Sequence, residues 1–94
     1  MNIRRLVLDV DKAIRQPTLI DLAKAIDGVS GVEGADITVT EIDLETVGTV
    51  ITVEGDQIDY PALVKAIEST GAVLHSVDEI ATGERLVEGV KRRR

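Results

Sequence analysis

The chain contains no phenylalanine, tryptophan or cysteine, and Tyr60 is its only aromatic residue. A hydrophobic core must therefore be built from aliphatic side chains, among which valine (13) and isoleucine (10) together outnumber leucine (8). Branching at Cβ restricts χ1 and favours extended backbone, so this composition predicts a core in which strands carry much of the packing. A length of 94 residues fits one small domain with a modest core.

The absence of cysteine also excludes several classes of function. Disulfides, thiol nucleophiles, zinc ribbons and iron–sulfur clusters all require cysteine. A copper chaperone of the heavy-metal-associated type requires a Cys-x-x-Cys pair in its first loop, because Cu(I) prefers thiolates. Here that loop reads Asp9-Val10-Asp11-Lys12-Ala13-Ile14-Arg15. Copper transfer is therefore excluded.

The charge pattern predicts a soluble protein that does not bind polyanions. The formal net charge of −6 includes four cations in residues 91–94, so the rest of the chain carries −10 and should repel nucleic acid. The longest apolar runs are far shorter than the ~20 residues that span a bilayer, and no apolar signal segment follows Met1. We expect a cytoplasmic protein with neither nucleic acid nor membrane as a partner.

Four segments have the composition and alternation of strands. In the first, Leu6 and Leu8 fall on the same face, which predicts its buried side. The second and third should form a hairpin around residues 45–48. Apolar positions in the second switch faces between Val39 and Ile42, which indicates a bulge. The expected strands span residues 3–10, 36–44, 49–55 and 73–80, and residues 11–16 are expected to form a loop.

Two helices are expected between these strands. The first should begin after Thr18, whose spacing to Asp21 is that of a capping box, and end at Gly28. The second should begin after Asp59 and end at Gly71. Apolar residues at three- and four-residue spacing predict one buried face on each helix. The expected buried positions are Leu19, Leu22, Ala23 and Ile26, and then Leu63, Ala66, Ile67 and Thr70.

The order βαββαβ predicts an α+β fold of the ferredoxin-like type, with a four-stranded antiparallel sheet in the order 4-1-3-2 and two helices on one face. We assign residues 1–90 to this single domain and residues 91–94 to a basic disordered tail. The other face of the sheet has no cover and meets either water or another copy. Its expected occupants are Arg5, Val7, Thr38 or Thr40, Thr52, His75 and Val77.

Carboxylates are the remaining candidates for metal chemistry, since Ca²⁺ and Mg²⁺ prefer oxygen ligands. The antiparallel first and fourth strands should place Asp9 and Asp11 near His75. No spacing matches a Ca²⁺ loop, so solvated surface carboxylates are the alternative to a divalent-cation site completed across a subunit interface. The candidate metal ligands are Asp9, Asp11, Glu41, Asp43, Glu45, His75, Asp78 and Glu79.

Five runs of residues resemble a known family. They are Ile3–Val10, Gly31–Thr38, Glu41–Thr46, Ala66–Ser69 and, above all, Leu74-His75-Ser76-Val77-Asp78-Glu79. They are similar to the small archaeal proteins catalogued as domain of unknown function 211, and the likeness covers nearly the whole chain. This resemblance implies a ferredoxin-like fold, assembly into ring-like homo-oligomers and no established activity. It supplies no catalytic residues.

Two functions of different class remain open. The first is a non-catalytic protein whose open sheet face or edge strands pair with copies of itself. The second is a regulatory module that senses a small molecule or a divalent cation at subunit interfaces, by analogy with amino-acid-binding domains of this topology. We do not expect an enzyme, because the sequence supplies no set of nucleophile, base and oxyanion donors.

Overall fold

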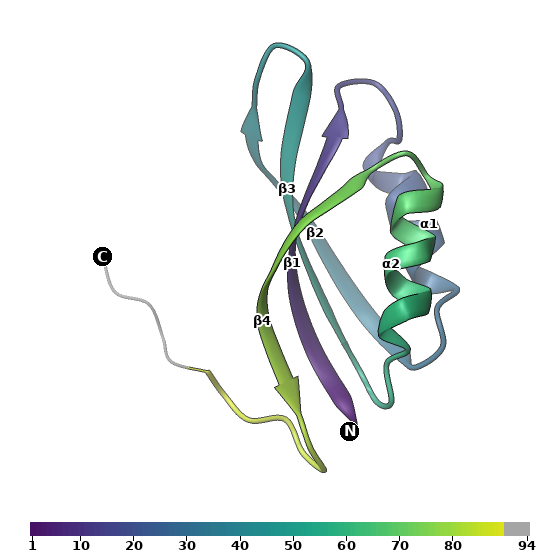
Figure 1. Cartoon of the computed structure of the whole chain (residues 1–94), viewed down its shortest axis with the longest axis vertical. Helices are drawn as coiled ribbons and strands as arrows, with labels where there is room; N and C mark the ends of the chain where they lie inside the picture. Colours follow the sequence, from purple (N-terminus) through teal and green to yellow (C-terminus); the bar gives the residue numbers. More distant parts are fainter. Residues whose placement is uncertain (90–94) are drawn as a thin grey trace.

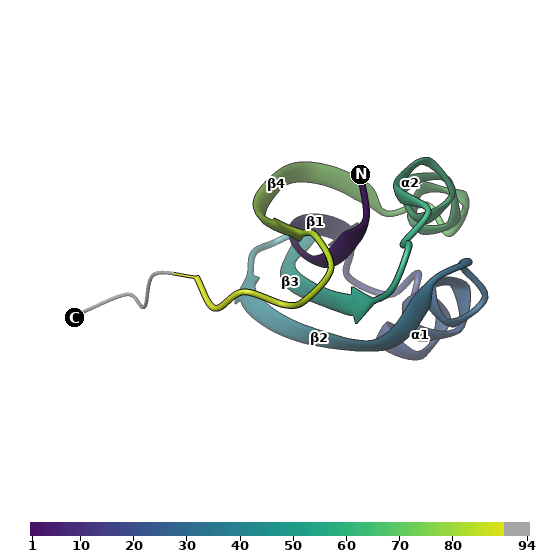
Figure 2. The same ribbon diagram turned by 90° about the horizontal axis from the view of Figure 1, so that it is seen from below.

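A computed structural model describes residues 1–89 of the protein. The elements follow in the order β1 (Ile3–Ala13), α1 (Leu19–Asp27), β2 (Val32–Ile42), β3 (Thr46–Gly55), α2 (Tyr60–Ser69) and β4 (Val73–Thr82). The strands pair antiparallel in the order β2-β3-β1-β4, which is the expected order read from the other edge. Both helices cover the same face of the sheet (Figure 1, Figure 2). The predicted ferredoxin-like α+β fold is confirmed.

The core lies between the two helices and the central strands β1 and β3. Leu6 and Leu8 of β1 are fully buried, as the alternation predicted. Ala23, expected to be buried, is exposed, whereas Ala25 is half-buried. The reason is that α2 approaches α1 on the side of Ala25, so the buried face of α1 is rotated away from Ala23. The other fully buried apolar residues are Val10, Leu22, Ile26, Ile51, Val53, Leu63 and Ile67.

Both helices begin with the caps that the sequence predicts. Oγ1 of Thr18 accepts a hydrogen bond from the backbone N–H of Asp21, and the Asp21 carboxylate accepts one from the backbone N–H of Thr18, both at 3.0 Å. Oδ1 of Asp59 accepts from the N–H of Ala62 at 3.1 Å. These bonds occupy N–H groups that have no partner within the helix, so the caps fix where each helix starts.

The strands run further than the sequence predicted. β1 continues to Ala13, because residues 11–13 pair with residues 46–48 of β3, where a loop and a turn were expected. β2 begins at Val32, four residues before the expected start at Asp36, and a register shift lies between Val32 and Gly34. The predicted bulge in β2 is confirmed by a register shift between Val39 and Glu41. The sheet is therefore longer than the alternation suggested.

The start of β2 and the end of β3 approach each other closely at two glycines. Gly31 has a φ of +89°, and its carbonyl oxygen accepts a hydrogen bond from the N–H of Asp56 at 2.9 Å. A Cβ at Gly55 would collide with this carbonyl, and a Cβ at Gly31 would collide with the carbonyl of Gln57. Only glycine fits at both positions, so the contact fixes how the edge strand β2 enters the sheet.

The helices are too short to cover the sheet from end to end. The nine residues of α1 rise about 14 Å, whereas the eleven residues of β2 extend about 36 Å. The β2–β3 hairpin accordingly projects beyond the helix layer (Figure 1). Within residues 1–89, neither helix is long and apolar enough to span a membrane.

The capping box of α1 should make part of the stability depend on pH. Hydrogen bonds from the backbone and then from the side chain of Thr18 hold the pKa of Asp21 below its ordinary value of 3.8. A lowered folded-state pKa stabilises the fold above the ordinary value, and this contribution is lost as the pH falls through the folded-state pKa. In urea unfolding from about pH 6 to about pH 2, Asp21→Asn should therefore lose less stability on acidification than the wild type.

The matched control is Asp27→Asn. Asp27 lies at the other end of α1, and its carboxylate makes no hydrogen bond or ion pair within residues 1–89. This variant should keep the pH dependence of the wild type. If the stability of Asp21→Asn fell with pH in parallel with that of the wild type and of Asp27→Asn, the capping box would contribute nothing to the pH dependence.

Candidate functional site

The face of the sheet opposite the helices, called here the open face, receives alternate residues from all four strands. Directly paired residues of antiparallel strands point to the same side, so the register defines this face once the buried positions of β1 are known. Its paired positions are Arg5, Val7, Asp9 and Asp11 on β1, Gly48, Val50, Thr52 and Glu54 on β3, Gly34, Asp36, Thr38 and Glu41 on β2, and Val73, Ser76, Glu79 and Ala81 on β4.

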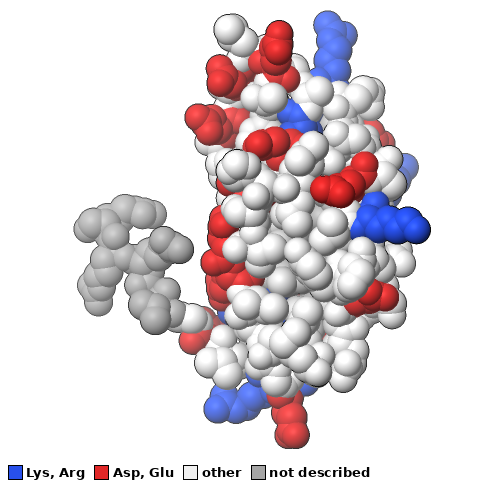
Figure 3. All heavy atoms as spheres, in the orientation of Figure 1, with Lys and Arg blue, Asp and Glu red and all other residues white. Residues whose placement is uncertain are grey.

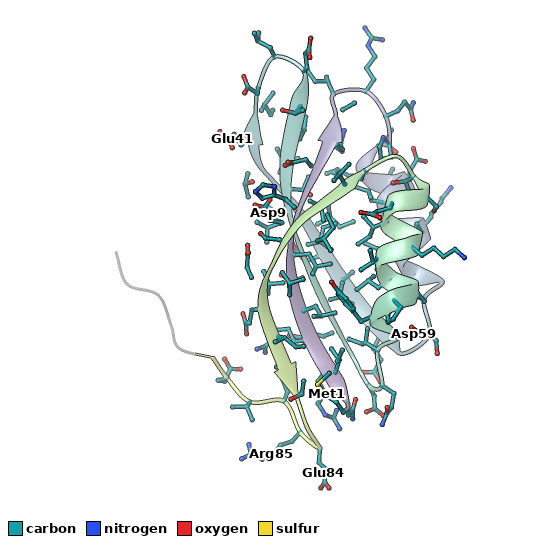
Figure 4. All side chains as sticks on the ribbon, viewed as in Figure 1. Met1, Asp9, Glu41, Asp59, Glu84 and Arg85 are labelled. Carbon is teal, nitrogen blue, oxygen red and sulfur yellow. The ribbon has the colours of Figure 1, made fainter. Side chains whose placement is uncertain are left out.

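The open face is strongly acidic. Six carboxylates and a single guanidinium occupy the paired positions just named. Asp and Glu side chains gather along the side of the molecule away from the helices (Figure 3), and Asp9 and Glu41 both point to that side (Figure 4). The sequence placed Arg5 and Val7 on this face correctly but missed Asp36 and Glu54. The strand register, which aligns those two carboxylates with Thr52 and Arg5, would have revealed them. The sequence was wrong about Val77, which pairs with the buried Leu8 and therefore belongs to the helix side.

Arg5 joins three strands across this face. Its Nε donates to Oε2 of Glu54 on β3, and its Nη1 donates to Oε2 of Glu79 on β4, both at 3.0 Å. The Arg5 side chain is 12% exposed, against 48% and 40% for the two glutamates. The hydrogen bond with Glu54 and then that with Glu79 raise the pKa of Arg5. Arg5 is therefore the fixed charge around which the acidic face is organised.

The eight predicted metal ligands are spread over the sheet and the hairpin turn. Asp9 and Asp11 are half-buried on β1, whereas Asp43 and Glu45 are exposed in the turn between β2 and β3. Oδ1 of Asp78 accepts a hydrogen bond from the Ser76 hydroxyl at 2.7 Å, and Glu79 is bound to Arg5 as described above. In residues 1–89, no three Asp, Glu or His side chains are grouped so that they could hold a metal ion.

His75 does not lie opposite Asp9. The register between β1 and β4 shifts between Asp9 and Val10, so that Ser76 pairs with Asp9 and Leu74 pairs with Val10. His75 falls in this irregularity and is exposed. A bulge leaves one residue unpaired and changes the alternation beyond it, so His75 lies next to the partner of Asp9 but directly opposite neither Asp9 nor Asp11.

Two of the predicted ligands do approach each other, on either side of Gly48. Gly48 pairs with Asp11 of β1 and with Glu41 of β2. A Cβ placed on Gly48 would lie 3.7 Å from Oδ1 of Asp11 and 3.6 Å from Cβ of Glu41. Because glycine has no side chain, the space between the two carboxylate-bearing residues stays open.

A second exposed surface lies where the sheet extends beyond the helices. Val39 and Ile42 of β2 pair with the buried residues Thr49 and Val47, so they belong to the helix side of the sheet, yet they are 39% and 73% exposed. Leu44 in the hairpin turn is 90% exposed. Exposed apolar residues that lie together commonly mark an interaction surface. We call Val39, Ile42 and Leu44 the apolar hairpin end.

Comparison with known proteins identifies the family of the chain. A family described as Uncharacterized ArCR, the domain of unknown function 211, matches residues 4–94. The chain belongs to this family. The Uncharacterized protein MJ0319 of Methanocaldococcus jannaschii is 39% identical over 90 residues, which cover 96% of this chain and 92% of that protein. The resemblance inferred from the sequence is thus confirmed. The name of this relative states no activity.

Removing Arg5 should weaken this domain more than removing an exposed arginine. In Arg5→Met the apolar stem is kept, but Glu54 and Glu79 lose their cation and face the other carboxylates of the open face. Like charges on neighbouring strands destabilise a sheet. We therefore expect a lower urea midpoint for Arg5→Met than for Arg85→Met, since Arg85 is exposed and makes no ion pair within residues 1–89.

The triple variant Arg5→Met, Glu54→Gln, Glu79→Gln tests the cause. It should recover part of the lost stability, because the amides remove the unpaired charges and keep the shape of both side chains. Equal midpoints for Arg5→Met and Arg85→Met would show that the two ion pairs of Arg5 do not stabilise the sheet.

Proposed function

We propose that this protein is non-catalytic and assembles with copies of itself into a ring-like homo-oligomer in the cytoplasm. The observation that carries the proposal is the edge strand β2, which is eleven residues long and exposed except for the half-buried Val32 and Ile37. The free side of an edge strand presents unpaired N–H and C=O groups to any other strand. Natural sheets usually keep such edges short or cover them, so a long bare edge supports pairing with another chain.

The apolar hairpin end strengthens this argument. Ile42 and Leu44 are 73% and 90% exposed at one end of the same edge. Burial of a whole leucine or isoleucine side chain contributes roughly 1.5–3 kcal/mol. A contact that covered both side chains would therefore add substantially to the backbone hydrogen bonds of a paired edge.

The geometry of the sheet is compatible with a ring. The two free edges belong to different strands, β2 and β4, so a contact between β2 of one copy and β4 of the next would be heterologous. Heterologous contacts close into rings when the rotation between neighbours fits a full turn, and the twist of paired strands supplies such a rotation. Stacking of two open faces is disfavoured, because it would bring like charges together. The same acidity supports the proposal that neither nucleic acid nor an anionic membrane is a partner.

A lysine at the apolar hairpin end should break the assembly and leave the subunit folded. In Ile42→Lys the exposed position tolerates the new side chain, but an edge interface would have to bury its charge. We expect the dissociation constant to rise at least about tenfold, which corresponds to about 1.4 kcal/mol. Sedimentation equilibrium at micromolar concentration should give a mass several times 10.1 kDa for the wild type and a smaller mass for the variant.

The matched control is Ile20→Lys on α1, where the isoleucine is 67% exposed and does not belong to the edge strand β2. This variant should sediment like the wild type. A wild-type mass near 10.1 kDa would overturn the proposed assembly, and equal effects of the two lysines would overturn the assignment of the interface to β2.

The second candidate is a sensing module for a divalent cation, favoured by the approach of Asp11 and Glu41 around Gly48. Ca²⁺ takes six to eight oxygen ligands, so two carboxylates would need further oxygens from a neighbouring copy. A small ligand at a subunit interface belongs to the same class of function. In either case the ligand would bind the assembled protein more tightly than the isolated subunit.

Thermal unfolding with Ca²⁺ or Mg²⁺ tests this candidate. Binding to the folded state alone adds about 2.7 kcal/mol at a cation concentration 100 times the dissociation constant, so the melting temperature should rise. The rise should disappear in Asp11→Asn with Glu41→Gln and remain in Glu68→Gln, which alters an exposed carboxylate on α2. Unchanged melting of the wild type in millimolar cation would leave these groups as solvated carboxylates.

A further inference from the structure

The chain beyond β4 is held by contacts with the first residues of β1. The N–H of Gly83 donates to the carbonyl oxygen of Asn2 at 2.9 Å. Nε of Arg4 donates to the carbonyl oxygen of Gly83 at 2.8 Å, and its Nη2 donates to that of Glu84. Asn2 and Arg4 at the start of the chain thus hold Gly83 and Glu84, which follow β4. These contacts fix the direction in which the following segment leaves the sheet.

Residues 84–89 run from these contacts onto the open face. Leu86 shares a small hollow with Glu54 and Gly55 at the end of β3. A Cβ placed on Gly89 would lie 3.3 Å from Oε2 of Glu79 on β4. Figure 2 shows the segment crossing below β1 and β3 and leaving on the side away from the helices. The described chain therefore ends beside the acidic surface.

That surface has more negative charge than its own cation can compensate. Arg5 is already shared between Glu54 and Glu79. The carboxylates of Asp9, Asp11, Asp36 and Glu41 have no lysine or arginine nitrogen within 4.0 Å among residues 1–89. Carboxylates on neighbouring strands repel each other, and a cationic segment laid across them would remove this repulsion.

The residues that follow Gly89 have the complementary charge. Their sequence is Val90-Lys91-Arg92-Arg93-Arg94, so each of the last four residues is a cation. Five residues extend at most about 17 Å, and the outer strands of a four-stranded sheet lie about 14 Å apart. The last five residues are thus long enough to span the open face from Glu79 on β4 to Asp36 on β2.

We propose that the open face is a docking surface for a basic peptide segment, and that residues 91–94 of the same chain occupy it. The attachment at Gly89 beside Glu79 favours the chain's own segment over that of another copy. A short tether gives an effective concentration in the millimolar range, well above micromolar protein. Single exposed ion pairs contribute little, but here four cations meet several unpaired carboxylates at once. The sequence interpretation of residues 91–94 as a disordered tail concerns residues outside those that the structure describes.

Such docking makes residues 91–94 an internal competitor for the open face. Any other basic segment must displace them before it can bind. Docking involves the open face and not the edge of β2, so its test does not require the proposed assembly to be correct.

A spin label on the last residue tests the proposal directly. The chain has no cysteine, so Arg94→Cys creates a single attachment site and keeps three of the four cations. The paramagnetic relaxation of backbone amides should be enhanced several-fold more at Val7, Asp9 and Thr52 than in α1 and α2. The preference for the open face should disappear in 1 M NaCl, where electrostatic screening acts over about 3 Å.

The matched control carries the same label and tether without the charges, through Lys91→Ser, Arg92→Ser and Arg93→Ser. Because attachment alone brings the label near Glu79, docking requires that the enhancement at Asp9 and Thr52 be clearly weaker in this control. Replacement of Asp9 and Asp36 by asparagine in the charged chain should weaken it as well. Equal enhancement with charged and uncharged tails would overturn the docking.

A mixed sample decides whose segment is bound. Spin-labelled protein without ¹⁵N is mixed with ¹⁵N-labelled protein without a spin label, so that any enhancement arises between two copies. Docking within one chain predicts little enhancement in this mixture and full enhancement in the doubly labelled protein, including in the assembly variant Ile42→Lys. Strong enhancement in the mixture would overturn the assignment to the chain's own segment.

Discussion

The mismatch in length between helices and strands determines which surfaces this protein leaves available. A helix rises 1.5 Å per residue and a strand about 3.3 Å, so the nine and ten residues of the helices cover less than half of the strand length. Leu6 and Leu8 lie under the helices and are fully buried, whereas Ile42 lies beyond them and is 73% exposed. Lys12 lies on the same side at this end, and its ammonium donates to the carbonyl oxygens of Ala13 and Ile14 at 2.8 and 3.1 Å. A lysine fits there because its stem packs on the sheet while its charged end meets polar groups.

The two faces of the sheet are stabilised by different interactions. On the helix side, aliphatic burial dominates, and Tyr60 is the only aromatic side chain that packs against this core. On the open face, the guanidinium of Arg5 connects β3 and β4 through β1. Edge strand β4, whose pairing with β1 is irregular at three places, gains most from this connection.

Local signals in the sequence predicted the order of the elements and the starts of both helices, because caps and alternation depend on residues close together in the chain. Thr18 with Asp21 and Asp59 with Ala62 form the expected caps. The site was harder to predict, since it depends on register. Shifts in the pairing of β4 leave His75 between the partners of Asp9 and Val10, and pairing between β2 and β3 brought Asp36 onto the acidic face. Bulges arise from how neighbouring strands fit together, and a single sequence contains no direct record of that fit.

The two proposed interactions are coupled through charge although they use different surfaces. Without residues 91–94 the chain carries −10, and with them it carries −6, so cations held on the open face lower the repulsion between neighbouring copies. At 0.1 M ionic strength charges act over about 10 Å, which is further than the width of two paired strands. Docking of the segment on its own open face would therefore strengthen edge-to-edge assembly without touching the interface. A competing basic ligand would replace the cations of this segment on the open face and so preserve the assembly. Loss of the segment without such a ligand would weaken the assembly.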